Sequence, residues 1–152
     1  MVNTKYILVI ASILSFGVAV FQAVISFVPE WSSAFDAGDA LVPNPPLLLA
    51  AGLLMALVFV LFGLYALSGA GMIRRLPLLN PGLFGIGAIY TARGIAFIPQ
   101  LLVLLGILPS VRVIPLAHLL SSLVSLSVGV LYLAGLVKIM NVSSIFQLDA
   151  KE

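Results

Sequence analysis

The sequence has no cysteine, one histidine and few charged residues of either sign. Among its 152 residues are five acids and seven lysines or arginines, so only 8% of the chain is charged. The absence of cysteine excludes disulfides, thiolate metal sites, iron–sulfur ligation and a cysteine nucleophile. A net charge of +2 is too small to indicate nucleic-acid binding. We therefore expect no nucleic-acid partner.

Hydrophobic residues, by contrast, make up 62% of the chain. Soluble domains are usually about half apolar and about a quarter charged. Four apolar runs are each long enough to cross a hydrocarbon core of about 30 Å at 1.5 Å per residue; they lie at about 6–28, 47–68, 82–108 and 116–140. The sequence predicts an all-α integral membrane protein, with one four-helix transmembrane bundle as its single domain and a short cytoplasmic tail at 141–152.

The positive charges are distributed unevenly between the two sets of connections. Arg112 alone lies in one set, whereas the other set and the chain ends hold Lys5, Arg74, Arg75, Lys138 and Lys151. The positive-inside rule then places both termini in the cytoplasm of a protein in the cell inner (plasma) membrane. A signal peptide is the alternative for the first run, but about 23 apolar residues without a clean cleavage site favour a retained span.

Arg93 is the only formal charge well inside any of the four runs. An arginine in hydrocarbon costs roughly 3 kcal/mol on insertion scales, so it normally faces protein, water or a bound group. Three interpretations stay open. Arg93 is a structural residue bonded to Gln22, Glu30, open carbonyls or lipid phosphate; it binds an anionic lipid or a small molecule; or it pairs with a partner subunit. No run contains an acid, so a carboxylate proton relay is not supported.

Steps of three and four residues divide the spans into stripes. In span three the polar stripe is Tyr90, Arg93, Phe97 and Gln100. Small residues, which let helices approach closely, predict packing faces at Ser15, Ala19 and Ala23 and at Ala88, Ala92 and Ala96. Pro99 cannot donate to the carbonyl of Ile95, so the third helix should bend or end there.

A short internal repeat bears on where span three ends. Residues 25–30 (ISFVPE) and 95–100 (IAFIPQ) match at a separation of 70 residues. A duplication would give two tandem helical hairpins in the same orientation and shorten span three to 82–99. Arg93 then joins a polar cup near the outer surface, made of Gln22, Glu30, Arg93, Gln100 and His118, with Ser121 and Ser122 just below. Without the repeat, Arg93 lies near the middle of the bilayer.

Other patterns are weak. A lone His118 without a second soft ligand is a poor metal site, and Glu30, Asp36 and Asp39 lack the spacing of an EF-hand, so we expect no metal and no cofactor. The glycines near Arg74 and Arg75 do not form a phosphate loop, because no Gly-Lys-Ser/Thr follows them. These arginines are expected to set topology and to contact anionic head groups.

These patterns favour binding over catalysis. The spans contain no paired carboxylates, no nucleophile with a base and no metal set, so we expect no enzyme. The leading interpretation is an accessory or assembly subunit of a membrane complex, or a homo-oligomer, with the lipid bilayer and another membrane protein or a second copy as partners. The alternative is a carrier, channel component or lipid-binding protein whose polar cup around Arg93 holds an anionic lipid or small molecule.

Overall fold

The computed structural model describes residues 4–28, 44–95, 97–107 and 116–149, and every regular element in these ranges is an α-helix. In chain order the helices are α1 (Thr4–Ser26), α3 (Pro45–Gly69), α4 (Leu79–Ile95), α5 (Phe97–Leu104) and α6 (Leu116–Asp149). Four stretches are long and apolar enough to cross a membrane: Thr4–Ser26, Pro45–Gly69, Leu79–Leu104 and His118–Asn141. The expected all-α chain with four apolar spans is confirmed.

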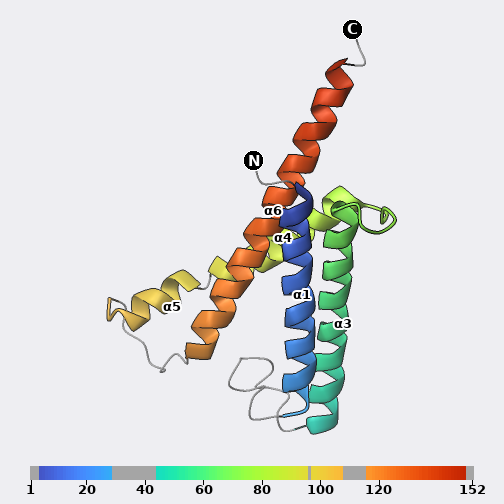
Figure 1. Ribbon diagram of the computed structural model, residues 1–152. Coiled ribbons are helices and arrows are strands. Elements are labelled where there is room, and N and C mark those ends of the chain that lie inside the picture. Colours follow the sequence, from blue (N-terminus) through green and yellow to red (C-terminus); the bar gives the residue numbers. More distant parts are fainter. Residues whose placement is uncertain (1–3, 29–43, 96, 108–115, 150–152) are drawn as a thin grey trace.

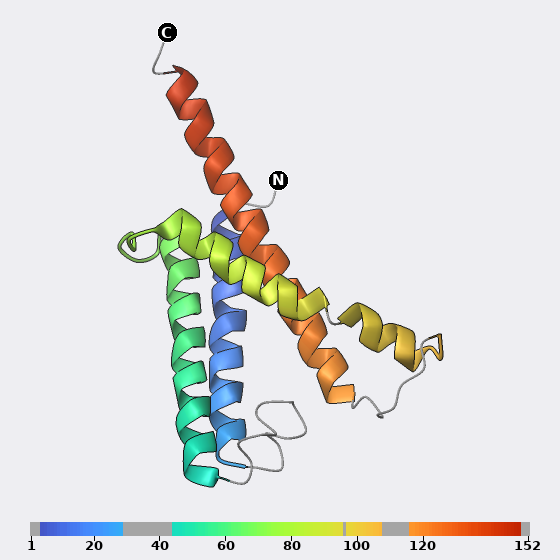
Figure 2. The same ribbon diagram turned by 180° about the vertical axis from the view of Figure 1, so that it is seen from behind.

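The helices are arranged as two close pairs that share a contact at one end. α1 lies along α3, α4 lies along α6, and α1 also contacts α6. Figures 1 and 2 show that α4 leaves the end of α3 at a slant and crosses beside α6, whereas α5 stands apart from α1 and α3. The core lies where α1, α3, α4 and α6 meet, around the fully buried side chains of Leu8, Leu83, Val128 and Tyr132.

Helix α3 carries clear signals at both ends. Its N-cap is Asn44, whose side chain accepts from the Leu47 N–H at 3.4 Å, and prolines occupy the first turn, where their missing N–H needs no acceptor. At the other end Gly71 has φ +71°, and the Met72 N–H donates to the Leu67 carbonyl at 3.0 Å. This is a Schellman C-cap, which ends the helix and satisfies its last carbonyls.

Helix α4 ends at Ile95, the residue four positions before Pro99. This agrees with the expectation that Pro99 cannot bond the Ile95 carbonyl and that its ring clashes there. The short α5 follows from Phe97 and ends in a second Schellman motif, with Gly106 at φ +72° and the Ile107 N–H donating to the Leu102 carbonyl at 2.9 Å. Span three, Leu79–Leu104, is therefore described as two helical segments, one on each side of residue 96.

Helix α6 has 34 residues, about 50 Å at 1.5 Å per residue, which is longer than a bilayer core requires. Its C-terminal part extends past the beginning of α1 (Figure 1). Within the segment 141–152, the expected short tail, α6 continues as far as Asp149.

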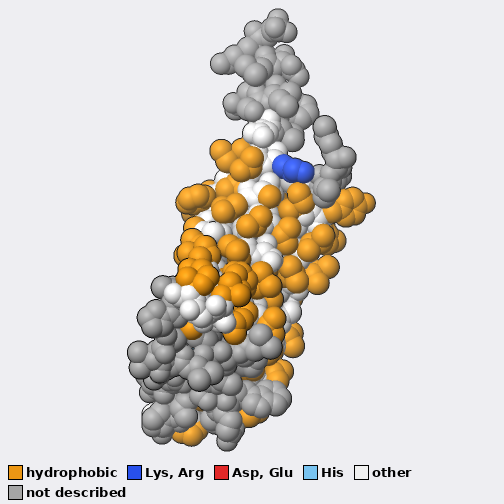
Figure 3. Space-filling model, turned by 90° about the vertical axis from the view of Figure 1, so that its left-hand side faces the viewer, with side chains coloured by type: hydrophobic (Ala, Val, Ile, Leu, Met, Phe, Trp, Pro, Cys, Tyr) orange, Lys and Arg blue, Asp and Glu red, His pale blue; other side chains and the backbone are white. Residues whose placement is uncertain are grey.

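The outward-facing side chains of the four spans are mainly apolar. Large hydrophobic residues such as Ile13, Leu54, Phe84 and Val130 are more than half exposed. Figure 3 shows one such face, on which hydrophobic side chains predominate and the visible lysine or arginine atoms lie near one end. A surface of this composition suits hydrocarbon and not water, as in a multi-pass membrane protein.

Candidate functional site

The middle of the bundle contains a small network of buried hydroxyl groups. The Tyr132 hydroxyl donates to the Phe62 carbonyl at 2.7 Å and lies 2.9 Å from the Ser15 hydroxyl, which must then donate to it. The Ser12 hydroxyl donates to the Gly63 carbonyl at 3.0 Å. Because a hydroxyl in a water-free interior needs a partner, these bonds fix α1 and α6 against α3.

Four aromatic rings surround this network. Tyr90 stacks on Phe59 and on Tyr132, with centroids 6.0 Å apart in each pair, and meets Phe62 edge-to-face at 5.8 Å. Tyr90 is therefore part of the core and only 3% exposed. The sequence predicts it on a polar stripe with Arg93. The Tyr90 hydroxyl has no hydrogen-bond partner among the described residues.

Glycines permit the close approach of α4 to α6. A Cβ on Gly94 would lie 2.5 Å from the backbone of Leu126, and one on Gly129 would overlap Thr91. Of the small residues expected to pack here, Ala88 is half-buried and Ala92 is exposed, while Ala96 lies outside the described residues. The close contact of α4 is thus made by glycines and Thr91, and Ala92 faces outward.

On α1, the small residues expected to form a packing face are more buried than those on α4. Ser15 and Ala19 are buried and Ala23 is half-buried. On the facing helix, a Cβ on Gly52 would overlap the Ser26 hydroxyl, and one on Gly63 would meet the Phe16 ring. Small residues on both helices therefore bring these two backbones together.

The residues of the expected polar cup lie on four different helices and make few bonds to one another. Gln22 is half-buried, with its amide nitrogen beside Gly52 of α3. Ser121 donates to the His118 carbonyl at 2.9 Å within α6, and Ser122 is buried. The buried Gln100 side-chain oxygen has no partner among the described residues, and Glu30 lies outside them.

Arg93 lies two residues before the end of α4 and its side chain is exposed. It makes no hydrogen bond or ion pair with any other residue that the structure describes. Its neighbours Ala92 and Ile95 are also exposed, and α5, which follows, has no buried residue. The residues around the junction of α4 and α5 therefore form an outward-facing surface with one charge in an otherwise apolar stretch. We call this surface the junction surface; it consists of Ala92, Arg93, Ile95, Ile98 and Leu104.

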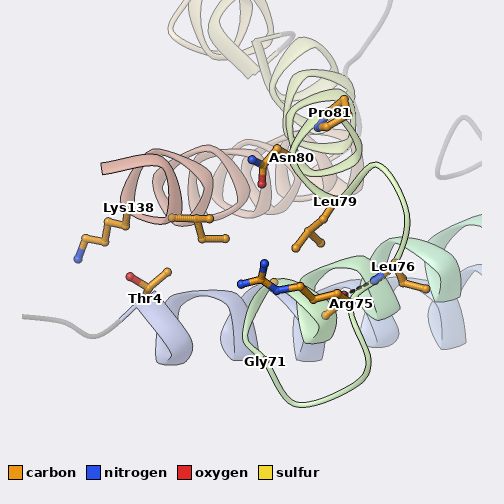
Figure 4. Close-up of a pocket in the computed structure, with 11 residues that line it drawn as sticks. Thr4, Gly71, Arg75, Leu76, Leu79, Asn80, Pro81 and Lys138 are labelled. Atoms are coloured by element: carbon orange, nitrogen blue, oxygen red, sulfur yellow. Dashed lines mark hydrogen bonds between the residues drawn. The ribbon is translucent and has the colours of Figure 1, made fainter. Parts of the chain in front are cut away.

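A cavity of about 600 Å³ lies at the opposite end of the bundle, where α1 and α4 begin and α3 ends. Its polar lining includes Arg75, Lys138, Asn80 and Thr4. Figure 4 shows the Arg75 side chain reaching into the space between α1 and α4, with Asn80 across from it and Lys138 at one edge. The cavity walls therefore come from three segments that are distant in the sequence: the start of α1, residues 68–81, and α6 near Lys138.

The loop that carries Arg75 is tied to α3. The buried Ser68 hydroxyl accepts from the Leu76 N–H at 2.9 Å and donates to the Arg74 carbonyl at 3.2 Å. The Tyr65 hydroxyl donates to the Pro77 carbonyl at 3.3 Å. These bonds hold residues on both sides of Arg75 and so fix where its side chain begins.

The end of the bundle with the cavity also gathers most of the described positive charge; we call it the cationic end. Lys5 and Arg74 lie there in addition to Arg75 and Lys138. Within the described ranges no group of three or more histidines, cysteines or acids is placed to hold a metal ion.

Comparisons with protein-family models, with curated proteins and with solved structures found no match.

Proposed function

We propose that this protein is a small multi-pass protein of the cell inner membrane that acts by binding another membrane protein, as an accessory or assembly subunit or in a homo-oligomer. The observation that carries the proposal is the exposed Arg93 side chain on the junction surface. A guanidinium at membrane depth is costly unless it is paired, and no described residue pairs with it. A partner helix that presents a carboxylate or open carbonyls would remove that cost.

The shape of the junction surface supports a protein partner. Ile95 of α4 and Ile98 and Leu104 of α5 are each more than half exposed, and the small Ala92, next to Arg93, lets a second helix approach closely. A partner would bury apolar side chains and satisfy one charge at the same time. α5, which carries Ile98 and Leu104, stands apart from α1 and α3 (Figure 2).

The proposal includes a topology and an origin for the fold. The cationic end faces the cytoplasm, so that both termini lie inside. The two close pairs, α1 with α3 and α4 with α6, arose by duplication of one helical hairpin, which the ISFVPE and IAFIPQ segments and the pairing support. The protein has no catalytic role.

Native mass spectrometry after gentle extraction from native membranes tests this function. The wild-type chain is compared with Arg93→Leu and with Arg74→Leu, which makes the same change in an exposed arginine at the cationic end. We expect a stoichiometric second protein, or a defined oligomer, that is retained by Arg74→Leu and lost in Arg93→Leu. A monomer in all three samples, or equal retention in both variants, would contradict the proposal.

A further inference from the structure

The cavity at the cationic end combines features that no other described part of the molecule shares. It is about 600 Å³, within the range of small-molecule sites and larger than a bare ion requires. Two cationic side chains, Arg75 and Lys138, line it. Asn80 and Thr4 add neutral hydrogen-bonding groups.

The backbone around the cavity also favours an anion. α1 and α4 both begin at it, and the first N–H groups of a helix have no intrahelical acceptor and carry partial positive charge. In α4 these are the N–H groups of Leu79 and Asn80, because Pro81 has none and the Gly82 N–H donates to the Leu78 carbonyl. α3 ends at the same place, but the Ala70, Gly71 and Met72 N–H groups bond its last carbonyls. The carbonyl groups at the C-terminal end of α3 are therefore largely satisfied.

The remaining walls are apolar. Leu76, Leu79 and Ile139 line the cavity beside the charged groups. An inorganic ion would leave these side chains without a partner, whereas the glycerol and first methylenes of a lipid, or the carbon skeleton of a phosphate ester, would contact them. Arginine holds phosphate oxygens with two parallel hydrogen bonds, and lysine adds a point charge.

From this geometry we propose that the cavity is a binding site for the phosphate group of an organic phosphate, presented by an anionic phospholipid head group or by a soluble phosphate ester. Arg75 and Lys138 bind the phosphate oxygens, Asn80 and Thr4 bind the neighbouring oxygens, and the leucines contact the carbon skeleton. This site is separate from the junction surface, and it does not depend on the proposed protein partner.

The test measures binding to the full-length chain in two arms. In the first arm the protein, in phosphatidylcholine nanodiscs, is titrated with phosphatidylglycerol and bound lipid is counted by native mass spectrometry. In the second arm the same nanodiscs receive glycerol 3-phosphate, and binding is measured by isothermal titration calorimetry. Saturation in the first arm alone identifies a lipid site, and saturation in the second shows that soluble esters enter.

Arg75→Gln is compared with Arg74→Gln, its neighbour in the chain that does not line the cavity. We expect Arg75→Gln to weaken binding about ten-fold, or about 1.4 kcal/mol, and Arg74→Gln to leave it nearly unchanged. Should Arg75→Gln fail to fold, Lys138→Gln, which changes the other cationic side chain of the cavity, is the second variant. No saturable binding in either arm, or equal losses in Arg74→Gln and Arg75→Gln, would overturn the proposal.

Discussion

At the scale of single residues, the Tyr132 hydroxyl is the best-connected polar group of the described core. It joins α6 to the Ser15 hydroxyl of α1 and to the Phe62 carbonyl of α3. Tyr132→Phe removes both bonds and leaves the buried Ser15 hydroxyl without this partner, so we expect the free energy of unfolding in mixed detergent micelles to fall by about 1 to 2 kcal/mol. Tyr6→Phe, at an exposed position, is the control and should have no measurable effect.

Gly94 and Gly85 offer a matched pair on the same helix. A Cβ on Gly94 would overlap the backbone of Leu126, whereas one on Gly85 would meet nothing within 4 Å. We expect Gly94→Ala to push α4 from α6 and to lower stability by about 1 to 3 kcal/mol. Gly85→Ala should be neutral or stabilising by up to about 1 kcal/mol. Equal effects in thermal unfolding would show that the α4–α6 contact is not close.

At the scale of elements, α5 differs from α1, α3, α4 and α6 because none of its residues is buried. Ile98→Ala and Leu104→Ala should therefore change the stability of the isolated protein by less than about 0.5 kcal/mol. If the junction surface binds a partner, the same variants should weaken co-purification of that partner. Leu83→Ala, in the core of α4, should instead cost about 2 kcal/mol or more. A large stability loss from the α5 variants would contradict an unburied helix.

Some elements of the fold could be predicted from the sequence and others could not. Local chemistry decides the span positions, the start of α3 after Asn44 and the end of α4 before Pro99, so these follow from composition, capping and proline geometry. The slant of α4 and the continuation of α6 to Asp149 depend on contacts between distant segments, such as Gly94 with Leu126.

Some features of the candidate sites could likewise be predicted from the sequence, and others could not. Arg93 stands out in the sequence because a charge in an apolar run is rare, yet its exposure depends on which face of α4 packs against α6. Tyr90, placed beside it by the helical period, belongs to the aromatic core. The cavity brings Thr4 and Lys138 together with the segment 68–81, which carries Arg75 and Asn80, and only tertiary packing joins these three segments. The sequence does indicate, from the uneven distribution of lysine and arginine, that Lys5, Arg74, Arg75 and Lys138 lie on one side of the membrane.

At the scale of the whole molecule, the distribution of charge predicts a single orientation in the membrane. Met72 lies at the cationic end and Pro46 at the other end of α3, and both are exposed. Since the chain has no cysteine, Met72→Cys and Pro46→Cys each create one reactive site. A membrane-impermeant maleimide should label Pro46→Cys in intact cells and Met72→Cys only after permeabilisation. The reverse pattern would place both termini outside.

Site-specific photo-crosslinking in native membranes tests most directly whether the junction surface binds a protein. A photoreactive residue replaces the exposed Ala92, next to Arg93 on the junction surface, or the exposed Leu54 of α3 as the control. We expect one defined protein adduct at position 92, formed with a second copy of the chain or with another membrane protein. This adduct should disappear when Arg93→Leu is added, and position 54 should give only lipid adducts. Lipid adducts alone at both positions would contradict a protein-binding role for the junction surface.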